Sequence, residues 1–167
     1  IDFYKECKDA GIKPIVGCEV YVANRTRFDR DPTVDNKRYH LTLLSKNNVG
    51  YKNLMKLVSK ANLEGFYYKP RIDKEILKLH GEGLIILSGC PGSEFVAYVR
   101  EKYFDKAKEL LQFYCDAVGR EHVFVEIMNH PEAPGMEWYH DILPDIVRIA
   151  KEVDLPIVGT WDSHYLC

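Results

Sequence analysis

Six residues with side chains that bind metals or transfer protons fall near the expected strands of this 167-residue sequence. They are Glu19, His40, Cys90, Glu126, Asp162 and His164. Parallel α/β folds place their sites at the ends of strands, so these side chains are candidates for one common site. Imidazole, carboxylate and thiolate groups together suit zinc, iron or manganese. Asp162 and His164 are one residue apart, so in an extended segment both point to the same side and can grip one ion or bridge two.

Each of these residues taken alone also has a structural interpretation. A lone histidine such as His40 is more often a hydrogen-bonded core residue than a ligand, and Cys90 alone suits a small buried position. Glu19 lies in an apolar strand, where an unpaired carboxylate is costly to bury, and this favours a functional role. The same cost applies to Glu126, which could instead pair with a basic neighbour. The prediction of a metal site therefore depends on several ligand types recurring in successive units.

The segment 65–71 is a second candidate site because it combines aromatic residues with the cations Lys69 and Arg71. Aromatic stacking together with Lys and Arg suits a contact with the phosphates of single-stranded nucleic acid. The alternative is a surface loop anchored by its own rings. The arginine-rich segment 24–38 is nearly balanced in charge, which predicts a solvated loop there.

The elements that must position these residues alternate regularly between strand and helix. Apolar and β-branched runs predict strands over 14–23, 39–44, 84–87, 122–127 and 156–160. Periodicity predicts helices over 2–10, 48–61, 73–81, 93–118 and 137–153. Asp73 is the expected N-cap of the third, the segments 93–100 and 103–118 form one or two helices, and the last is expected to be interrupted or bent near Pro144. This alternation indicates a parallel β/α architecture. Five strands suit a doubly wound sheet, or a barrel that lacks its first units.

Composition places the chain among single-domain globular proteins, with 46% hydrophobic and 29% charged residues. The net charge of -2 excludes a strongly basic footprint for the whole chain, and the apolar runs are too short to span a membrane. Five widely spaced cysteines without a C-x-x-C pair argue against a disulfide framework and favour a reducing, cytoplasmic setting. Residue 1 is not Met, and the chain opens directly into a helix. We therefore expect residues 1–167 to be a partial domain, truncated at both ends.

Several segments, in their order along the chain, resemble the PHP (polymerase and histidinol phosphatase) domain of bacterial DNA polymerase III alpha subunits. They are G-C-E-V-Y at 17–21, Y-H-L-T-L-L at 39–44, G-Y-K-N-L at 50–54, E-G-F-Y-Y-K-P-R-I-D at 64–73, G-L-I-I-L-S-G-C-P-G at 83–92, E-I-M-N-H at 126–130 and G-T-W-D-S-H-Y-L at 159–166. The resemblance runs over nearly the whole chain, and the combination is far more specific than any single segment.

The resemblance implies an irregular (β/α) barrel, seven-stranded in the family and incomplete here because its N-terminal strands are missing. It also implies a cluster of divalent metal ions, which are zinc, manganese, iron or magnesium in different members. At the matched positions the ligands would be Glu19, His40, Cys90, Asp162 and His164. Glu126 and His130 match positions that are not assigned as ligands. The family's H-x-H and T-D-H motifs, which carry the remaining ligands, are absent, and Trp161 stands where an Asn often precedes the D-x-H aspartate.

The resemblance implies function at two levels. The parent protein would be the catalytic alpha subunit of the bacterial replicase, a DNA-directed DNA polymerase whose polymerase aspartates lie outside this chain. Its partners would be DNA, an exonuclease subunit and the sliding clamp, with no membrane involved. The PHP domain itself would be a metal-dependent phosphoesterase, and in some members a 3′–5′ proofreading exonuclease.

Two alternatives to a catalytic domain stay open. One is a non-catalytic scaffold that stabilises the polymerase and docks a separate exonuclease subunit. The other is a free-standing phosphatase acting on a small ester such as histidinol phosphate. Segments 50–54 and 64–73 argue against this phosphatase, because they resemble the polymerase branch of the family specifically. Since it lacks part of the ligand set, the chain by itself is expected to be inactive.

Overall fold

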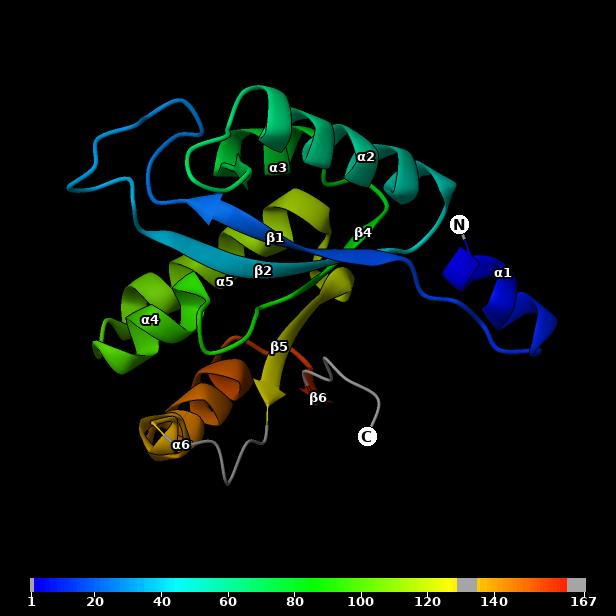
Figure 1. Ribbon diagram of the computed structural model, residues 1–167. Coiled ribbons are helices and arrows are strands. Elements are labelled where there is room, and N and C mark those ends of the chain that lie inside the picture. The colour runs from blue at the N-terminus through cyan, green and yellow to red at the C-terminus, as the bar shows by residue number, and fades with distance from the viewer. Residues whose placement is uncertain (1, 129–134, 162–167) are drawn as a thin grey trace.

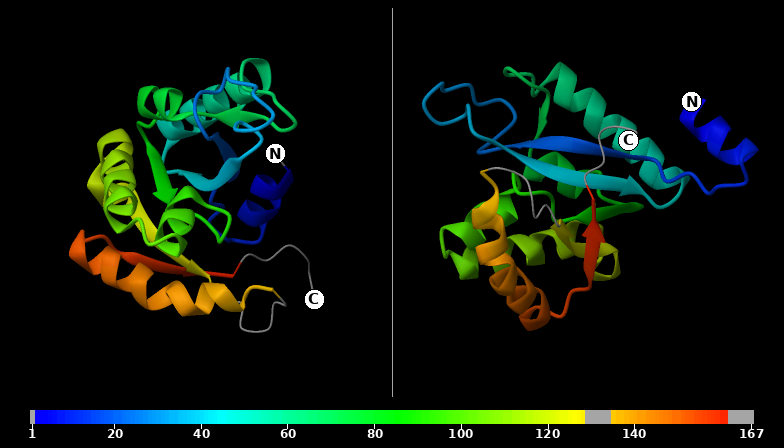
Figure 2. Two further views of the ribbon diagram at one scale, coloured as in Figure 1. Left: turned by 90° about the vertical axis from the view of Figure 1, so that its left-hand side faces the viewer. Right: turned by 60° about the horizontal axis from the view of Figure 1, so that its bottom comes forward.

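A computed structural model of the chain describes residues 2–128 and 135–161. The described part forms a curved six-stranded sheet, and most of its helices lie along the outer side of that sheet (Figures 1 and 2). In chain order the elements are α1 (Asp2–Asp9), β1 (Gly17–Ala23), β2 (Arg38–Ser45), α2 (Asn48–Leu63), β3 (Arg71–Ile72), α3 (Lys74–Leu79), β4 (Leu84–Leu87), α4 (Glu94–Arg100), α5 (Phe104–Val118), a short 3-10 helix (Arg120–His122), β5 (Val123–Met128), α6 (Glu137–Glu152) and β6 (Ile157–Thr160).

The strands lie in the order β3-β1-β2-β4-β5-β6. The pairs β1–β3, β4–β5 and β5–β6 are parallel, as the alternation of strands and helices predicts. Strand β2, however, runs antiparallel to both of its neighbours, β1 and β4, so the prediction of a sheet parallel throughout is wrong at β2. The physical reason is the connection between β1 and β2, since residues 24–37 contain no helix and a parallel pair needs a long crossover.

The sheet is mixed and mainly parallel, and within the described residues it does not close into a barrel. It is consistent with the expected barrel-like (β/α) fold, while the seventh strand stays a prediction. Strand β3 was not expected as a strand, because two residues are too few to show a periodic pattern. Helix α1 stands apart from the sheet in Figure 1, and none of its described side chains is buried.

The two faces of the sheet differ in character. Partners across neighbouring strands share a face, and residues alternate between the faces along each strand. The face toward the helices forms the core together with apolar side chains of α2 to α6. Its fully buried apolar strand residues are Leu41, Leu43, Ile72, Leu84, Ile86, Val123 and Val125. The opposite face carries Glu19, His40, Thr42, Leu87 and Glu126, which the strand registers place on one side. The polar candidates therefore collect on the inner face.

Side-chain caps begin helices α2, α3 and α4. Asp73 accepts a hydrogen bond from the backbone N–H of Ile76 and so caps α3, which confirms its predicted role. Asn47 and Ser93 cap α2 and α4 in the same way. The segment 93–118 forms two helices, and α6 is not interrupted at the exposed Pro144. None of the helices in the described residues has the length and apolar character to cross a membrane.

Candidate metal centre

Glu19, His40 and Cys90 meet at the inner face of the sheet. Their ligand atoms, one from each residue, all lie within 4.8 Å of one another. The Nδ1 atom of His40 is 2.5 Å from Glu19 Oε1 and 3.1 Å from Cys90 Sγ, so the imidazole stands between the carboxylate and the thiol. Three of the five predicted ligands are thereby brought together.

The pairing of the strands explains why these residues meet. Glu19 faces Thr42 and His40 faces Tyr21 in the β1–β2 pair, so Glu19 and His40 are diagonal neighbours on one face. Because β2 is reversed, its first residues lie beside the last residues of β4, and the backbone N–H of His40 donates to the carbonyl of Gly92. The start of one strand and the end of another therefore share an edge. The antiparallel direction of β2, which was not predicted from the sequence, therefore brings His40 next to Cys90 and completes the group of three ligands.

The turn that carries Cys90 depends on close backbone approach. Gly89 has a φ of 98°, and a Cβ at this position would lie 2.9 Å from the carbonyl oxygen of His40. A larger residue here would be strained and would also push the turn away from β2. The backbone N–H of Gly92 approaches Cys90 Sγ at 3.4 Å. The turn is thus shaped around the thiol and the imidazole.

The donor set fits a divalent metal ion. One carboxylate, one imidazole and one thiol are the three side-chain types that bind zinc and related ions. The side chains of His40 and Glu19 are 34% and 48% exposed, so an ion held by them would be reachable from solvent. The ring of Tyr21 contacts the edge of His40 with ring centroids 5.1 Å apart and limits its orientation. Three protein ligands with an open side are the arrangement of a site that still accepts water or substrate.

The other predicted ligands, Asp162 and His164, lie outside the described residues, as does His130. Their assignment stays a prediction. In the sequence they follow β6, which ends at Thr160 and pairs with β5. Glu126 of β5 is on the inner face but is not part of the described group of three ligands. Its side chain accepts a hydrogen bond from Thr160, a partner that the sequence interpretation did not find.

The predicted phosphate contact has to be divided between its two residues. Lys69 is exposed and remains a candidate. Arg71 is fully buried, and its guanidinium donates to the backbone carbonyls of Gly65, Arg27, Asp29 and Asp35. The prediction that Arg71 contacts phosphate is therefore corrected. Its guanidinium is buried and joins two loops through their backbone carbonyls.

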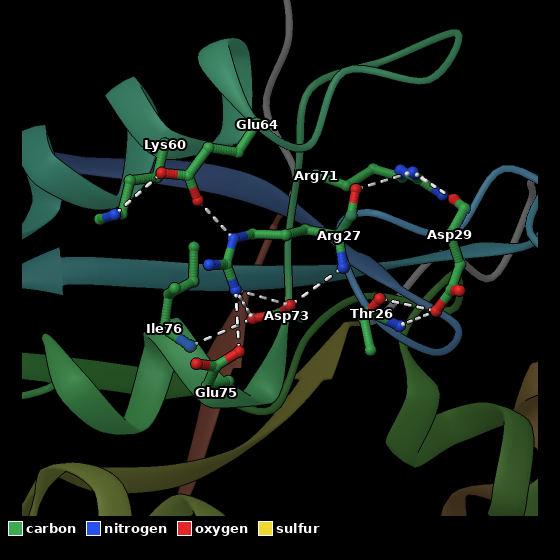
Figure 3. A network of polar contacts seen from close by, with 9 residues as sticks. All are labelled: Thr26, Arg27, Asp29, Lys60, Glu64, Arg71, Asp73, Glu75 and Ile76. Atoms are coloured by element: carbon green, nitrogen blue, oxygen red, sulfur yellow. Dashed lines mark hydrogen bonds and ion pairs between the residues drawn. The ribbon is translucent and has the colours of Figure 1, made fainter.

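The segment 24–38 is mostly exposed, as its balanced charge predicted, but Arg27 and Asp35 within it are buried. Arg27 is buried, and its guanidinium donates to Glu64 at 2.6 Å, to Asp73 at 3.0 Å and to Glu75 at 3.1 Å (Figure 3). Its backbone N–H donates to Asp73 as well. These contacts join the loop to the end of α2 and the start of α3. Asp73 was identified from the sequence as a helix cap. Its second contact, the ion pair with Arg27, was not predicted.

Two carboxylates of these loops are held ionised by their partners. Hydrogen bonds from Arg25 keep the pKa of Asp35 below its usual value. A hydrogen bond from Lys60, and a second from Arg27, lower the pKa of Glu64. Both groups therefore contribute more to stability as carboxylates than as acids.

Comparisons with a family model and with individual proteins point to the same family. The family model of the PHP domain matches residues 1–130. The chain is 40% identical over 166 residues to a DNA polymerase III subunit alpha of Treponema pallidum (strain Nichols), which covers 99% of this chain and 14% of that protein. It is 42% identical over 168 residues to the protein of that name from Thermus aquaticus, covering 99% of this chain and 13% of that protein. The chain spans about a seventh of the length of these relatives.

Proposed function

Because this chain belongs to the PHP domain family, we propose that it is part of the alpha subunit of a bacterial replicative DNA polymerase and that its inner face holds divalent metal. The family match covers residues 1–130, and the relatives named as alpha subunits match 99% of the chain. We propose residues 1–167 as one partial PHP domain. DNA synthesis would belong to other parts of the complete protein, with DNA, an exonuclease subunit and the sliding clamp as partners.

The observation that carries the metal proposal is the meeting of Glu19, His40 and Cys90 from three separate strands or strand ends. Glu19 and Cys90 would bind as carboxylate and thiolate, and His40 as the neutral imidazole. Asp162 and His164 are proposed to complete the site. A bound ion would supply Lewis-acid chemistry for cleavage of a phosphate ester. The residues themselves orient the ion and leave it open toward solvent.

We propose 3′–5′ exonuclease activity on single-stranded DNA as the function of a complete site. The exposed Lys69 is retained in this proposal as a phosphate contact, on the basis of its charge beside exposed aromatic side chains. A small phosphate ester is the less favoured substrate, because the matched relatives carry the name of a polymerase subunit.

The test compares the complete protein with its Asp162→Asn and His164→Ala variants. Bound metal and release of 3′ nucleotides from single-stranded DNA are measured in each, and Asp141→Asn on the exposed side of α6 is the matched control. We expect both site variants to lose activity while the control keeps it. Metal without activity in the unaltered protein would contradict a nuclease and support the scaffold. Absence of metal would overturn the ligand assignment and leave the scaffold role.

A further inference from the structure

Arg38 is a cation on the inner face of the sheet. It is the first residue of β2 and lies two residues before His40, so the two side chains leave the same face of the strand. The register that pairs His40 with Tyr21 puts Glu19 on this face as well. The guanidinium therefore shares a surface with proposed metal ligands.

The ring of Tyr21 contacts both Arg38 and His40. Arg38 Cζ lies over this ring at 5.2 Å from its centroid, and the centroid of the His40 ring is 5.1 Å from the same centroid. A guanidinium over a tyrosine face is attracted by the ring and is held there. Tyr21 therefore fixes the position of Arg38 relative to His40.

The guanidinium of Arg38 has donors that the described part of the protein does not use. Its Nη1 atom donates to the backbone carbonyl of Asn36 at 3.3 Å, whereas the buried Nε atom has no hydrogen-bond partner among the described residues. Arg25 and Arg27 of the preceding loop are paired with carboxylates, and Arg38 forms no such pair within residues 2–128 and 135–161. A buried N–H without a partner is costly, so an acceptor from a ligand is favoured at this position.

A phosphate is the ligand that this arrangement suits. Arginine offers donors in a fixed planar fork that matches two phosphate oxygens, and it stays charged at any working pH. The guanidinium contacts Tyr21 rather than a ligand side chain, so the phosphate that it holds would be a neighbour of the one at the metal. A polynucleotide carries a phosphate at every nucleotide, whereas a small monoester carries only one.

We propose that Arg38 binds a backbone phosphate of a single-stranded nucleic acid that lies along the inner face toward Glu19, His40 and Cys90. The inference rests on the proposed function, because this phosphate would belong to the substrate of the proposed metal centre. It adds a subsite for the substrate beside the metal ligands.

The first test follows the chemical reactivity of Arg38 in the complete protein. Methylglyoxal, a small dicarbonyl, modifies accessible arginines, and peptide mass spectrometry gives the rate at each one. The rates are measured in a metal chelator, alone and with a single-stranded thymidine hexanucleotide, with inorganic phosphate, or with thymidine, which carries no phosphate. Arg148 is the matched control, because it also lies over an aromatic ring, that of Phe104, in the layer of α5 and α6.

We expect the hexanucleotide to slow the modification of Arg38 about tenfold at about ten times its dissociation constant, because only the free fraction reacts. Thymidine should have no effect, and Arg148 should react at one rate throughout. An unchanged Arg38 rate would overturn the inference, as would slowing by inorganic phosphate alone. Failure of methylglyoxal to modify Arg38 in the free protein would also overturn it, since a phosphate of similar size could not reach the guanidinium.

The second test separates this subsite from the metal ligands. In Arg38→Gln we expect the KM for release of 3′ nucleotides to rise about tenfold, the effect of one lost hydrogen bond between charged groups, while kcat and metal content stay unchanged. Arg148→Gln should keep all three values. An unchanged KM or a loss of metal in Arg38→Gln would overturn the inference.

The two tests also distinguish the inference from the proposed function. The modification of Arg38 is followed without metal, so it does not depend on a working nuclease. Protection of Arg38 in a protein without nuclease activity would contradict the proposed function alone. Nuclease activity without protection of Arg38 would contradict the subsite alone.

Discussion

Arg71 and Lys69 are two residues apart in the sequence and lie in opposite environments. Lys69 is exposed, whereas Arg71 is fully buried and donates to four backbone carbonyls. Residue type alone did not separate them, because an arginine beside aromatic residues suits both a phosphate contact and a buried anchor. A buried guanidinium that satisfies carbonyls from two loops is a structural requirement of this fold.

Replacing Arg71 by Met should therefore strongly destabilise the folded protein. The carbonyls that it satisfies would lose their donors, and we expect the free energy of unfolding to fall by about 3 kcal/mol or more. Urea unfolding of the complete, metal-free protein measures this loss. The exposed Arg30→Met is the control, with an expected change within about 0.5 kcal/mol. Equal losses in the two variants would show that Arg71 is not an anchor.

At the scale of elements, the ionic contacts of Arg27 join the loop 24–37 to α2 and α3. Glu64 is one of its partners, and its pKa is lowered in the folded protein by Lys60 and Arg27. A carboxylate with a lowered folded pKa stabilises the protein above its unfolded pKa, which is about 4.3 for Glu. That stabilisation is lost as the pH falls through the folded value.

We predict that the free energy of unfolding declines less steeply below about pH 4.3 in Glu64→Gln than in the unaltered protein, because one linked proton is removed. Urea titrations between neutral pH and acid measure the decline. Glu109→Gln on the exposed side of α5 should behave like the unaltered protein. The same pH dependence in all three proteins would contradict the linkage of Glu64 to folding.

Element positions were predicted more accurately than strand directions. The strand at Leu84–Leu87 and the cap at Asp73 were found because apolar runs and capping residues are local signals. The direction of β2 depends on the whole connection before it. The helix-free link over 24–37 is the local signal for an antiparallel pair, and the sequence interpretation did not use it.

The candidate site could be predicted residue by residue, but not as an arrangement. Glu19, His40 and Cys90 were selected from their types and the family resemblance, and the structure brings them together. Their contact depends on strand register and on the turn at Gly89, which are tertiary features. The burial of Arg27 could not be seen, because a loop with balanced charges looks the same whether its ion pairs are solvated or enclosed.

At the scale of the whole molecule, the sheet ends in two edge strands within the described residues. Strand β3 pairs with only Tyr21 and Val22 of β1, and β6 is the last strand at the other edge. Exposed apolar side chains lie nearby at Ile15, Ile157 and Trp161. Unpaired edges and apolar patches of this kind promote association.

The 167-residue chain, prepared alone, should therefore associate with itself. We expect a sedimentation coefficient that rises with protein concentration, and little material remaining at high concentration. The complete protein at the same molar concentration is the control and should sediment as one species. If the chain stays monomeric and melts cooperatively by itself, its sheet edges and exposed apolar side chains do not need to be covered by other parts of the complete protein.

Glu19, His40 and Cys90 are proposed to hold a divalent metal ion. The most direct test is the number of zinc or manganese ions per molecule in the complete protein and in His40→Ala, with His80→Ala outside the site as control. We predict that the unaltered protein and the control retain the same metal content after dialysis, while His40→Ala loses at least one ion. Equal metal content in His40→Ala and the unaltered protein, or no metal in either, would contradict the claim.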